Sequence, residues 1–433
     1  MQAHIIKGQK YTPPLQPVKK SDTTTQVTMQ EAFNAGDWIE PPYELTGLHD
    51  LVRESTILPQ CIRAYKDNIA GFGIGVKYAE DVEESDEANT EYNRMAQIIE
   101  LLNTEQDTKE VFEDLIEARE TYGVAYLEVI RNMNGEVQQI EFLHDTPSIR
   151  MTVPLEPRIE TTYFNRGEAV QRKKKFRKFR QQLGGKTVYF KEFGDPRRMD
   201  WRDGHYLEDG EVLDIAYEAN EILDFSIGIQ PYGEVRWIGQ VLGVDGSRRA
   251  ERLNNNYFIN GRHTPLMIMI QGGTLTNESY DKLTKYMDDI KGEAGQHAFI
   301  VLETESTDSK TDFDETEKPK IEVKDLASIL QKDELFQSYM DNNRKKVQSS
   351  FLLPDLYTGY TTDFNRATAQ TAQEVTEKQV FQPERKSLAW AINNRLLNAY
   401  GFKYVEAYFL EPNISNPDDI TKLLTAATAA GGV

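Results

Sequence analysis

Apolar residues recur at intervals of three and four positions along much of the chain, a spacing that places them on one face of an α-helix. In the first third of the chain this spacing predicts helices over 48–69, 92–103 and 108–122. Thr108 stands where an N-cap residue is expected, and Gly123 stands where the last of these helices should stop. Each helix presents an apolar face that other elements must cover.

Two stretches in which apolar and polar residues alternate predict a β-hairpin. They cover 125–131 and 137–143, and between them lies Asn134-Gly135, a pair that favours the tight turn of a hairpin. A second pair of strands is predicted over 187–193 and 212–215. The first half of the chain is therefore expected to combine helices with strands.

Two further helices carry apolar residues along only a narrow stripe. The first covers 234–260 and the second covers 326–351. A helix with so few apolar positions packs against neighbouring helices instead of lying inside a core. The periodicity alone leaves two arrangements open: an antiparallel helical hairpin within one chain, or a wall that many copies build around a ring.

A compact mixed segment lies between these two helices. Its pattern predicts strands over 266–271, 298–303 and 320–323, and a helix over 277–291 that Thr276 caps. The loop between the last two strands is acidic. Such a loop suits a basic partner, but a solvated, mobile connection is the explanation that we favour.

A long connection follows the second narrow helix. Pro354 and Gly359 interrupt helical structure there, and the connection runs for about 15 residues, which exceeds the usual 2–8 between helices. This length favours a functional loop over a plain connection. A long helix over 367–400 comes next, and Pro383 is expected to kink it. A strand and a short helix over 418–430 end the pattern.

Composition bounds the class of protein. The chain has 433 residues, of which 39% are hydrophobic and 28% charged, enough for two or three domains with a sizeable core. No apolar run approaches the roughly 20 residues that a membrane helix needs, so we expect a soluble protein without a membrane span. Nothing at the N-terminus indicates secretion. The single cysteine, Cys61, excludes an internal disulfide framework and is expected to be buried.

The net charge of −20 argues against a protein that grips nucleic acid over its whole surface, because such proteins place Lys and Arg against the phosphates. It does not argue against a conduit for DNA, since strong phosphate contacts would hinder sliding. Excess acid also simply keeps a large protein soluble. Charge therefore permits both interpretations.

One segment reverses the acidic balance. Between 166 and 191 the only acid is Glu168, whereas Lys and Arg stand at 166, 172, 173, 174, 175, 177, 178, 180, 186 and 191. The segment is either a local phosphate-facing patch, or a solvated loop or edge strand whose cations pair with the acids of a neighbouring subunit or simply blunt an exposed edge. We favour the edge strand, because strand alternation explains the interleaved Phe176 and Phe179 equally well.

No motif for catalysis or metal binding emerges. The six histidines lack metal-ligand spacing, and the chain has neither a phosphate-binding Walker sequence nor a nucleophile elbow. Pairs such as Glu303 with Glu305, or His144-Asp145, are explained by the abundance of acids. We expect no cofactor, no metal and no catalytic residue. A metal-dependent hydrolase is the form that an enzyme would take, with no specific support.

Three passages, taken in order, resemble the portal proteins of tailed bacteriophages. The first is Tyr122-Gly-Val-Ala-Tyr-Leu-Glu-Val-Ile-Arg with the strand that returns after Gly135. The second is the helix that stops at Asn260-Gly261, followed at once by an apolar strand after Pro265. The third is the kinked helix. Portal proteins of phages and prophages are the ring channels through which viral DNA enters and leaves the capsid.

The resemblance implies an α+β portal fold, with an α/β wing, a two-helix stem, an inserted α/β clip and a short helical crown, assembling as a ring. The polar residues at the N-terminus are expected to form an arm. The implied domains are the arm at 1–45, the wing at 46–232 and 369–410, the stem helices at 233–262 and 326–351, the clip at 263–325, the tunnel loop at 352–368 and a short or truncated crown at 411–433.

The resemblance also implies a function. The chain would form a homo-oligomer, a dodecamer as in the family, at one capsid vertex. It would conduct double-stranded DNA without reading its sequence and without being an enzyme. Its partners would be the terminase large subunit, then the head–tail connector or adaptor, and the major capsid protein, with no membrane. It would reside in the virion, and in the host cytoplasm during assembly. Another head–tail adaptor or capsid subunit is the alternative.

The implied site residues form three groups. Those near DNA in the tunnel loop are Thr358, Tyr360, Thr361, Asn365 and Arg366. Those of the stem channel wall are Arg248, Arg249, Arg252, Arg344, Lys345 and Lys346. Those of the clip that would face the terminase or the adaptor are Glu303, Glu305, Asp308, Asp312, Asp314 and Glu315.

Overall fold

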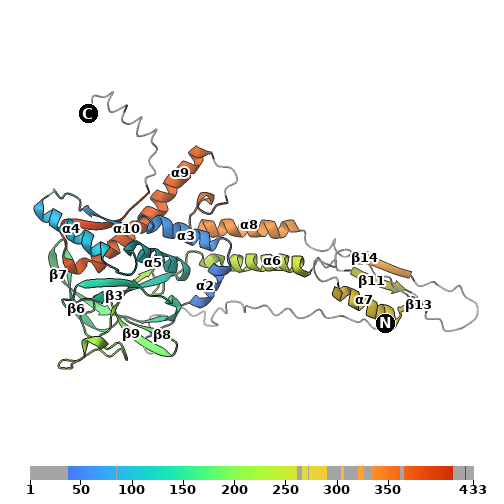
Figure 1. Cartoon of the computed structure of the whole chain (residues 1–433), viewed down its shortest axis with the longest axis horizontal. Coiled ribbons are helices and arrows are strands. Elements are labelled where there is room, and N and C mark those ends of the chain that lie inside the picture. Colours follow the sequence, from blue (N-terminus) through green and yellow to red (C-terminus); the bar gives the residue numbers. More distant parts are fainter. Residues whose placement is uncertain are drawn as a thin grey trace, which may run out of the picture. The chain divides into compact units, whose positions relative to one another are not determined.

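The structure is a computed structural model. It describes residues 38–83, 85–260, 266–271, 273–289, 304–306, 320–325, 333–360, 365–412 and 425. The chain divides into two compact units (Figure 1). The first unit comprises the residues up to Gly239 and those from Gln348 onward, and the second comprises Gln240–Val347.

A seven-stranded sheet forms the centre of the first unit. Its strand order is β1-β5-β8-β9-β10-β3-β4, and all neighbours are antiparallel except β9 and β10. The strands are β1 (Trp38–Ile39), β5 (Ile149–Thr152), β8 (Lys178–Leu183), β9 (Lys186–Glu192), β10 (Glu221–Ser226), β3 (Val124–Arg131) and β4 (Val137–Phe142).

The hairpin predicted around Asn134-Gly135 is confirmed, because β3 and β4 pair antiparallel. The Asn132 side chain accepts hydrogen bonds from the backbone N–H groups of Asn134 and Glu136 and so holds the turn together. Gly135 has a φ of +79°, which glycine adopts without a steric cost. Local turn chemistry therefore decided this part of the fold, as the sequence indicates.

Helices α2 (Leu45–Glu54), α3 (Leu58–Ile69) and α5 (Thr108–Tyr122) pack together, and α5 also packs on β3. The carboxylate of Asp107 accepts a hydrogen bond from the Lys109 N–H, so Asp107 is the N-cap of α5 and not Thr108 as predicted. Gly123 ends the helix with a φ of +88°, as expected. Cys61 is buried as predicted, and burial raises the pKa of its thiol to about 12.

Helix α4 (Asp86–Glu100) begins six residues earlier than predicted, because the Ser85 hydroxyl caps it by accepting a hydrogen bond from Ala88 N–H. The strand pair predicted over 187–193 and 212–215 is wrong in its second member. β9 pairs instead with β8 and β10, whereas Val212 is 95% exposed. Val212 is apolar but lies in a loop, so the sequence pattern wrongly indicated a strand there.

The basic segment runs through β7 (Glu168–Phe176), β8 and β9. β7 pairs with β6 (Leu155–Asn165) to form a separate two-stranded sheet. Cations of the segment pair with acids of the same chain: Lys174 with Glu192 at 2.6 Å, Lys175 with Glu156 at 2.5 Å and Arg177 with Asp224 at 4.0 Å. The segment is therefore strand, but acids of its own chain supply ion pairs that the prediction assigned to a neighbouring subunit.

The long C-terminal helix is an alternation of helix types. α9 (Arg366–Thr376) continues as a π-helical turn, η7 (Glu377–Phe381), and then as α10 (Gln382–Ala391). Pro383 lies in the first turn of α10, directly after the wide turn, because a residue without an N–H cannot continue the α-helical bonding pattern. A second π turn, η8 (Ile392–Leu396), and a 3₁₀ turn, η9 (Asn398–Tyr400), precede β15 (Val405–Phe409), which pairs with β2 (Ile74–Tyr78).

The second unit contains two long helices and small β-sheets. The helices are α6 (Val241–Asn260) and most of α8 (Asp333–Ser350). Between them in sequence come β11 (Leu266–Gln271), β12 (Gly273–Leu275), α7 (Asn277–Asp289), β13 (Thr304–Ser306) and β14 (Lys320–Asp325). β11 pairs with β14 and β12 pairs with β13, both antiparallel.

Two boundaries in this region were predicted with different success. Thr276 caps α7 as predicted, because its hydroxyl accepts a hydrogen bond from Ser279 N–H at 3.1 Å. α6 begins at Val241 and not at 234, since Val235 and Trp237 are buried in the first unit and a 3₁₀ turn follows them. The predicted arm before Trp38, the strand over 298–303 and, apart from residue 425, the helix over 418–430 lie outside the described residues.

In the described part of the chain, no helix is both long and apolar enough to cross a membrane.

Candidate functional site

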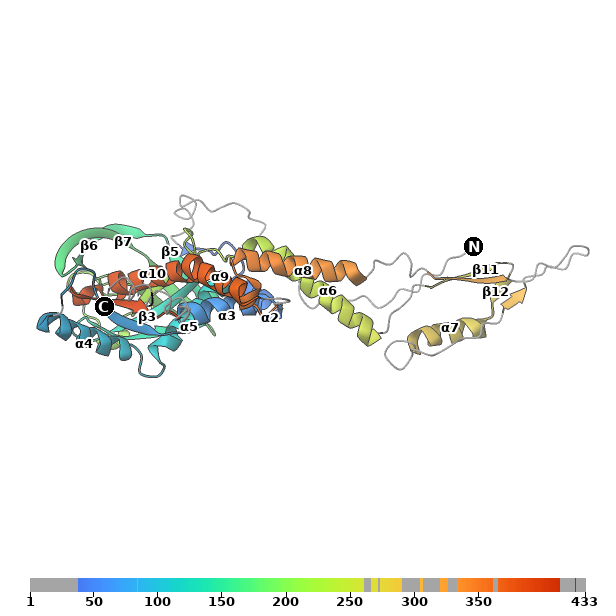
Figure 2. The same ribbon diagram turned by 90° about the horizontal axis from the view of Figure 1, so that it is seen from above.

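The helices α6 and α8 contact each other through the first turns of α6 (Figure 1), and Figure 2 shows them diverging beyond that region. The Asn343 side chain donates hydrogen bonds to the Gly243 carbonyl oxygen at 3.2 Å and to the Ser247 hydroxyl at 3.1 Å. Tyr339, one turn earlier in α8, lies against Gly246 in α6. Because the contacts run in opposite directions along the two helices, the helices are antiparallel.

Small residues make this close packing possible. A Cβ atom on Gly246 would stand 2.2 Å from the Tyr339 hydroxyl oxygen, and one on Gly243 would stand 3.1 Å from Asn343 Oδ1. Reasoning from the sequence missed this contact, although two glycines three positions apart in a helix were a visible signal. Asn343 is buried with both donors satisfied, so it fixes the register of the two helices.

The arginines expected to line the stem are partly neutralised within α6. Arg248 and Arg249 share one carboxylate, that of Asp245, at 2.9 Å and 2.7 Å. The Arg248 side chain is buried, whereas that of Arg249 is 48% exposed. Arg252, one turn further on, is half-buried. Of these three, Arg249 offers the most accessible charge.

On α8 the expected cations differ in the same way. Arg344 pairs with Asp341 at 3.5 Å and is 22% exposed. Lys345 and Lys346 are exposed, and neither forms an ion pair with another residue in the part of the chain that the structure describes. An anion that approaches this helix would therefore meet Lys345 and Lys346 first.

The connection after α8 is held firmly at its start. Tyr65 donates a hydrogen bond to the Phe351 carbonyl oxygen at 2.8 Å. Thr358, expected near DNA, is instead buried at 6% exposure. Its hydroxyl bonds to the amide of Gln348, whose Nε2 also donates to Asp355 Oδ1 at 3.0 Å. Thr358 thus holds the loop in shape and does not present its side chain to solvent.

The remaining loop residues are more accessible. Tyr360 is 37% exposed. Asn365 and Arg366 are exposed at the start of α9, where the Asn365 carbonyl accepts the first helical hydrogen bond from Ala369 N–H. Thr361 lies outside the described residues. The structure therefore leaves Tyr360, Asn365 and Arg366 as the residues of this group that could touch a passing molecule.

The acidic residues of the inserted segment are mostly beyond what the structure describes. Glu305 lies in β13, where its backbone pairs with Thr274. Glu303, Asp308, Asp312, Asp314 and Glu315 lie outside the described residues. This group stays a prediction.

An alternating network of four charged side chains lies in the first unit, and one of them, Arg236, comes shortly before α6 in the sequence. Arg119 bonds to Glu120 and to Glu384, both at 2.8 Å. Arg236 bonds to the same two carboxylates, to Glu120 at 2.8 Å and to Glu384 at 2.5 Å. Glu120 is completely buried and Arg119 is 5% exposed. Sequence periodicity missed this network, which joins α5, α10 and the segment that leads to α6.

The network shifts the pKa values of two of its members, Glu384 and Arg236. Burial by itself would raise the pKa of Glu384, but Arg119 and Arg236 outweigh it, and the pKa is lowered. Burial would likewise lower the pKa of Arg236, but Glu120 and the other partners outweigh it, and the pKa is raised. Glu384 and Arg236 are therefore both held in their charged forms. The arrangement anchors position 236 to two helices, α5 through Glu120 and α10 through Glu384.

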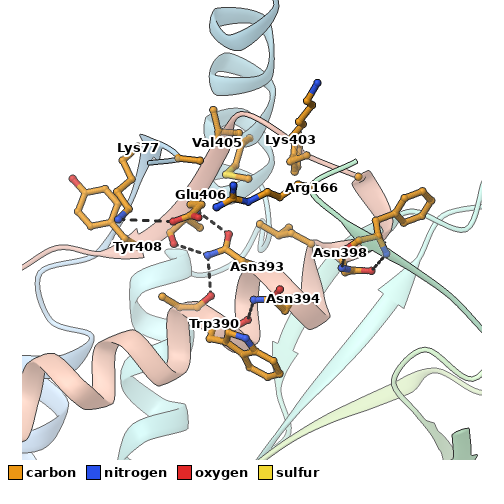
Figure 3. A pocket seen from close by; sticks show the side chains of 18 of the residues that line it. Lys77, Arg166, Trp390, Asn393, Asn394, Asn398, Lys403, Val405, Glu406 and Tyr408 are labelled. Atoms are coloured by element: carbon orange, nitrogen blue, oxygen red, sulfur yellow. Dashed lines mark hydrogen bonds and ion pairs between the residues drawn. The ribbon is translucent and has the colours of Figure 1, made fainter. Parts of the chain in front are cut away.

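A pocket of about 350 Å³ lies between the C-terminal helices, β15 and the β6–β7 turn (Figure 3). Two of its asparagine side chains form hydrogen bonds to the backbone of neighbouring segments. Asn393 donates to and accepts from the backbone of Ala407, and Asn398 does the same with Phe164. Lys77 pairs at 3.8 Å with Glu406, which is the only acid among the described residues that line the pocket. Neither histidine nor cysteine is among the described residues that line the pocket.

The described residues contain no group of three or more His, Cys, Asp or Glu that could hold a metal ion.

The chain is similar in sequence to two proteins of Bacillus subtilis (strain 168). It is 38% identical to the uncharacterized protein YqbA, over 100% of this chain and 85% of that protein. It is 39% identical to the phage-like element PBSX protein XkdE, over 92% of this chain and 82% of that protein. No family model matches the chain.

Two solved structures share its fold. One is a chain from the neck of an empty gene transfer agent particle, computed with C6 symmetry, with a TM-score of 0.54 at 15% identity over 92% of this chain and 93% of that chain. The other is a chain from the virion of a native gene transfer agent particle, with a TM-score of 0.53 at 15% identity over 94% and 95% of the two chains. At this identity the likeness concerns the fold alone.

Proposed function

Because the chain belongs to the family of XkdE and YqbA, the phage and prophage portal family that its sequence resembles, we propose that it forms the ring channel for double-stranded DNA at one vertex of a capsid. The α+β portal fold expected from the sequence is the fold that the structure has. The function in DNA packaging and ejection goes beyond family and fold, and it rests on the geometry of the second unit.

The observation that carries the proposal is the close antiparallel pair of α6 and α8 with a small α/β segment inserted between them. Asn343 and the glycines of α6 lock the register of the pair. Repeated around an axis, such a pair gives a continuous wall of helices. Heterologous contacts between identical subunits close into a ring when the rotation between them is a whole fraction of a turn.

The charges on this wall fit a channel through which a polyanion slides. Asp245 neutralises part of the charge of Arg248 and Arg249, which limits the strength of phosphate contacts. Arg249, Lys345 and Lys346 remain accessible for weak contacts. Such contacts address the DNA backbone, so they are independent of base sequence and weaken as salt rises.

The tunnel-loop residues that we assign to DNA are Tyr360, Asn365 and Arg366. All three have exposed or partly exposed side chains in one copy of the chain. Thr361 lies outside the described residues, so it is included in the proposal on the basis of the sequence alone. Thr358 is not included, because its side chain is buried. Arg366 supplies the charge and Tyr360 supplies a flat surface that can lie along a sugar–phosphate backbone.

Subunit number and partners complete the proposal. The related neck structure was computed with C6 symmetry, and twelve copies satisfy a six-fold axis. We propose that the inserted segment at 263–325 docks the terminase large subunit and later the connector, with its acids facing basic partners. The wing would contact the major capsid protein. The terminase would supply the energy, and this chain would supply geometry and no catalysis.

Electron microscopy of negatively stained, purified protein tests the proposal directly. We expect rings with a central hole, together with a mass in solution that corresponds to about twelve copies. The same rings should bind double-stranded DNA weakly, with an affinity that falls as salt is raised and does not depend on sequence. The proposal would be contradicted if only compact single copies without an aperture were seen, at micromolar concentration and at every salt concentration.

A further inference from the structure

Helix α9 has few contacts with the other described helices and strands. Its extensive contacts with described elements are confined to η7, its own continuation. Figure 1 shows α9 extending away from the end of α10. α9 spans 11 residues at the start of the long C-terminal helix, and tertiary packing supplies most of the stability of helices in proteins. A further surface packed against its apolar side would therefore stabilise it.

α9 is amphipathic, and its apolar side faces an open groove. The groove has a volume of about 670 Å³, and the residues that line it are Leu352, Leu353, Pro354, Thr368, Thr371, Ala372, Val375 and Thr376. Val375, one of these lining residues, is 46% exposed although its side chain is apolar. The opposite side of the helix is polar, with Arg366, Gln370 and Glu374.

Leu352 lies at the edge of this groove with a strained backbone. Its φ is +56°, in the left-handed region, which costs a residue with a Cβ atom about 1 kcal/mol. Its side chain is nevertheless 67% exposed to water. Within one copy of the chain, the strained backbone therefore holds an apolar side chain in contact with water, which does not stabilise the fold. Strained residues persist where they position a contact.

The charge of the groove indicates what covers it. None of its lining residues is charged, although the chain as a whole carries a net charge of −20. Copies with that charge repel one another, so they approach most easily through surfaces without acids. Nucleic acid is disfavoured as the occupant, since phosphates are attracted by Lys and Arg. An uncharged apolar groove suits a second copy of this chain.

We propose that the groove formed by Leu352 and the apolar side of α9 is a subunit contact, covered by the neighbouring copy in the ring. This inference rests on the proposed function, because a ring provides such a neighbour for every copy. Assembly then orders α9, and the polar side of the helix, with Arg366, is left free to face the channel. The step that joins two subunits is also the step that fixes the DNA-facing residues.

Hydrogen exchange of the unmodified full chain provides one test. Backbone amides of 370–376 should exchange at least roughly tenfold more slowly in rings than in subunits dissociated by dilution. Amides of β3 and β10 in the central sheet should exchange equally in both states, which serves as the internal control. Equal protection of α9 in both states would mean that its own chain covers it, and rapid exchange in both would mean that no copy covers it; each result overturns the inference.

Substitutions provide the second test. Leu352→Gly removes the apolar side chain and also the strain, so single subunits should be at least as stable as the wild type. Val375→Asp places a charge in the groove. Each should raise the subunit concentration at half-assembly at least roughly tenfold in mass photometry, which corresponds to about 1.4 kcal/mol. The matched control is Leu101→Asp, at a residue that is 62% exposed at the end of α4, and it should leave assembly unchanged.

Rings of wild-type stability in both groove variants would overturn the inference and leave the proposed function intact. A wild-type chain that never assembles would overturn both. Weaker assembly in all three variants, including the control, would show a general effect of altered surfaces and would also overturn the inference.

Discussion

The hydroxyl oxygen of Tyr339 in α8 stands only 2.2 Å from the point where a Cβ atom on Gly246 in α6 would lie. Only glycine is compatible with this position of the tyrosine. The next atom of the ring, Cζ, would lie at 3.1 Å, so most of the steric conflict concerns the hydroxyl group alone. The contact sets how closely the two helices approach.

Gly246→Ala should therefore act differently in two backgrounds. Alanine favours the helix by about 1 kcal/mol over glycine, but in the wild type it pushes the tyrosine away, which costs about as much or more. In the Tyr339→Phe background the hydroxyl is gone, and the same substitution should stabilise. Urea unfolding of the four proteins of this cycle measures the coupling, which we expect to be about 1 kcal/mol. Additive effects would contradict the prediction.

Arg236→Met should destabilise the first unit by about 3 kcal/mol, because it leaves the completely buried Glu120 with one cation in place of two. The control is Arg63→Met. Arg63 pairs with Asp67 on the surface, where the Arg63 side chain is 79% exposed. Loss of this ion pair should therefore change the free energy of unfolding too little to be measured. Thermal unfolding followed by circular dichroism compares them. Equal stability of the two variants would show that the network is not stabilising.

Acid should weaken the network at Glu384 and the ion pair of Asp224 with Arg395. The pKa values of both carboxyls are lowered in the folded protein: burial opposes ionisation, but Arg119 and Arg236 outweigh it at Glu384, and Arg395 does so at Asp224. A lowered folded pKa contributes stability that is present above the unfolded pKa, about 4, and is lost as pH falls through the folded value.

The measurement is the melting temperature between pH 7 and pH 3. Glu384→Gln should be less stable than the wild type at pH 7, and the difference should shrink as the pH falls below about 4. A difference that stays constant over this range would contradict the assigned pKa shift. Wild-type rings and dissociated subunits should be measured separately, because assembly contributes its own pH dependence.

Tyr360→Ala and Arg366→Ala should impair packaging or retention of DNA while leaving rings intact. Arg366 is exposed and Tyr360 is 37% exposed, so neither side chain belongs to the buried core. Thr358→Ala is the contrasting variant: it breaks a buried hydrogen bond with Gln348 and should cost about 1–2 kcal/mol of stability. Packaging assays beside electron microscopy separate these effects. Loss of rings in the Tyr360 or Arg366 variants would show that these residues are structural.

Some features of this protein follow from sequence alone because short-range chemistry decides them. The Asn134-Gly135 turn and the cap at Thr276 depend on residues within a few positions of one another, and both are observed as predicted. The apolar periodicity of α3 is similarly local, and it correctly indicated that Cys61 is buried. The order of these elements was enough to indicate the family.

Other features depend on residues that are far apart in the chain, and only the tertiary structure decided them. Arg119, Arg236 and Glu384 meet in one network, and no periodicity encodes their meeting. Thr358 is buried because Gln348 reaches its hydroxyl, and Val212 is exposed because β8 and β10 take the places beside β9. Hydrophobic patterns record which residues avoid water, whereas the partner that shields each one is settled by packing across the whole chain.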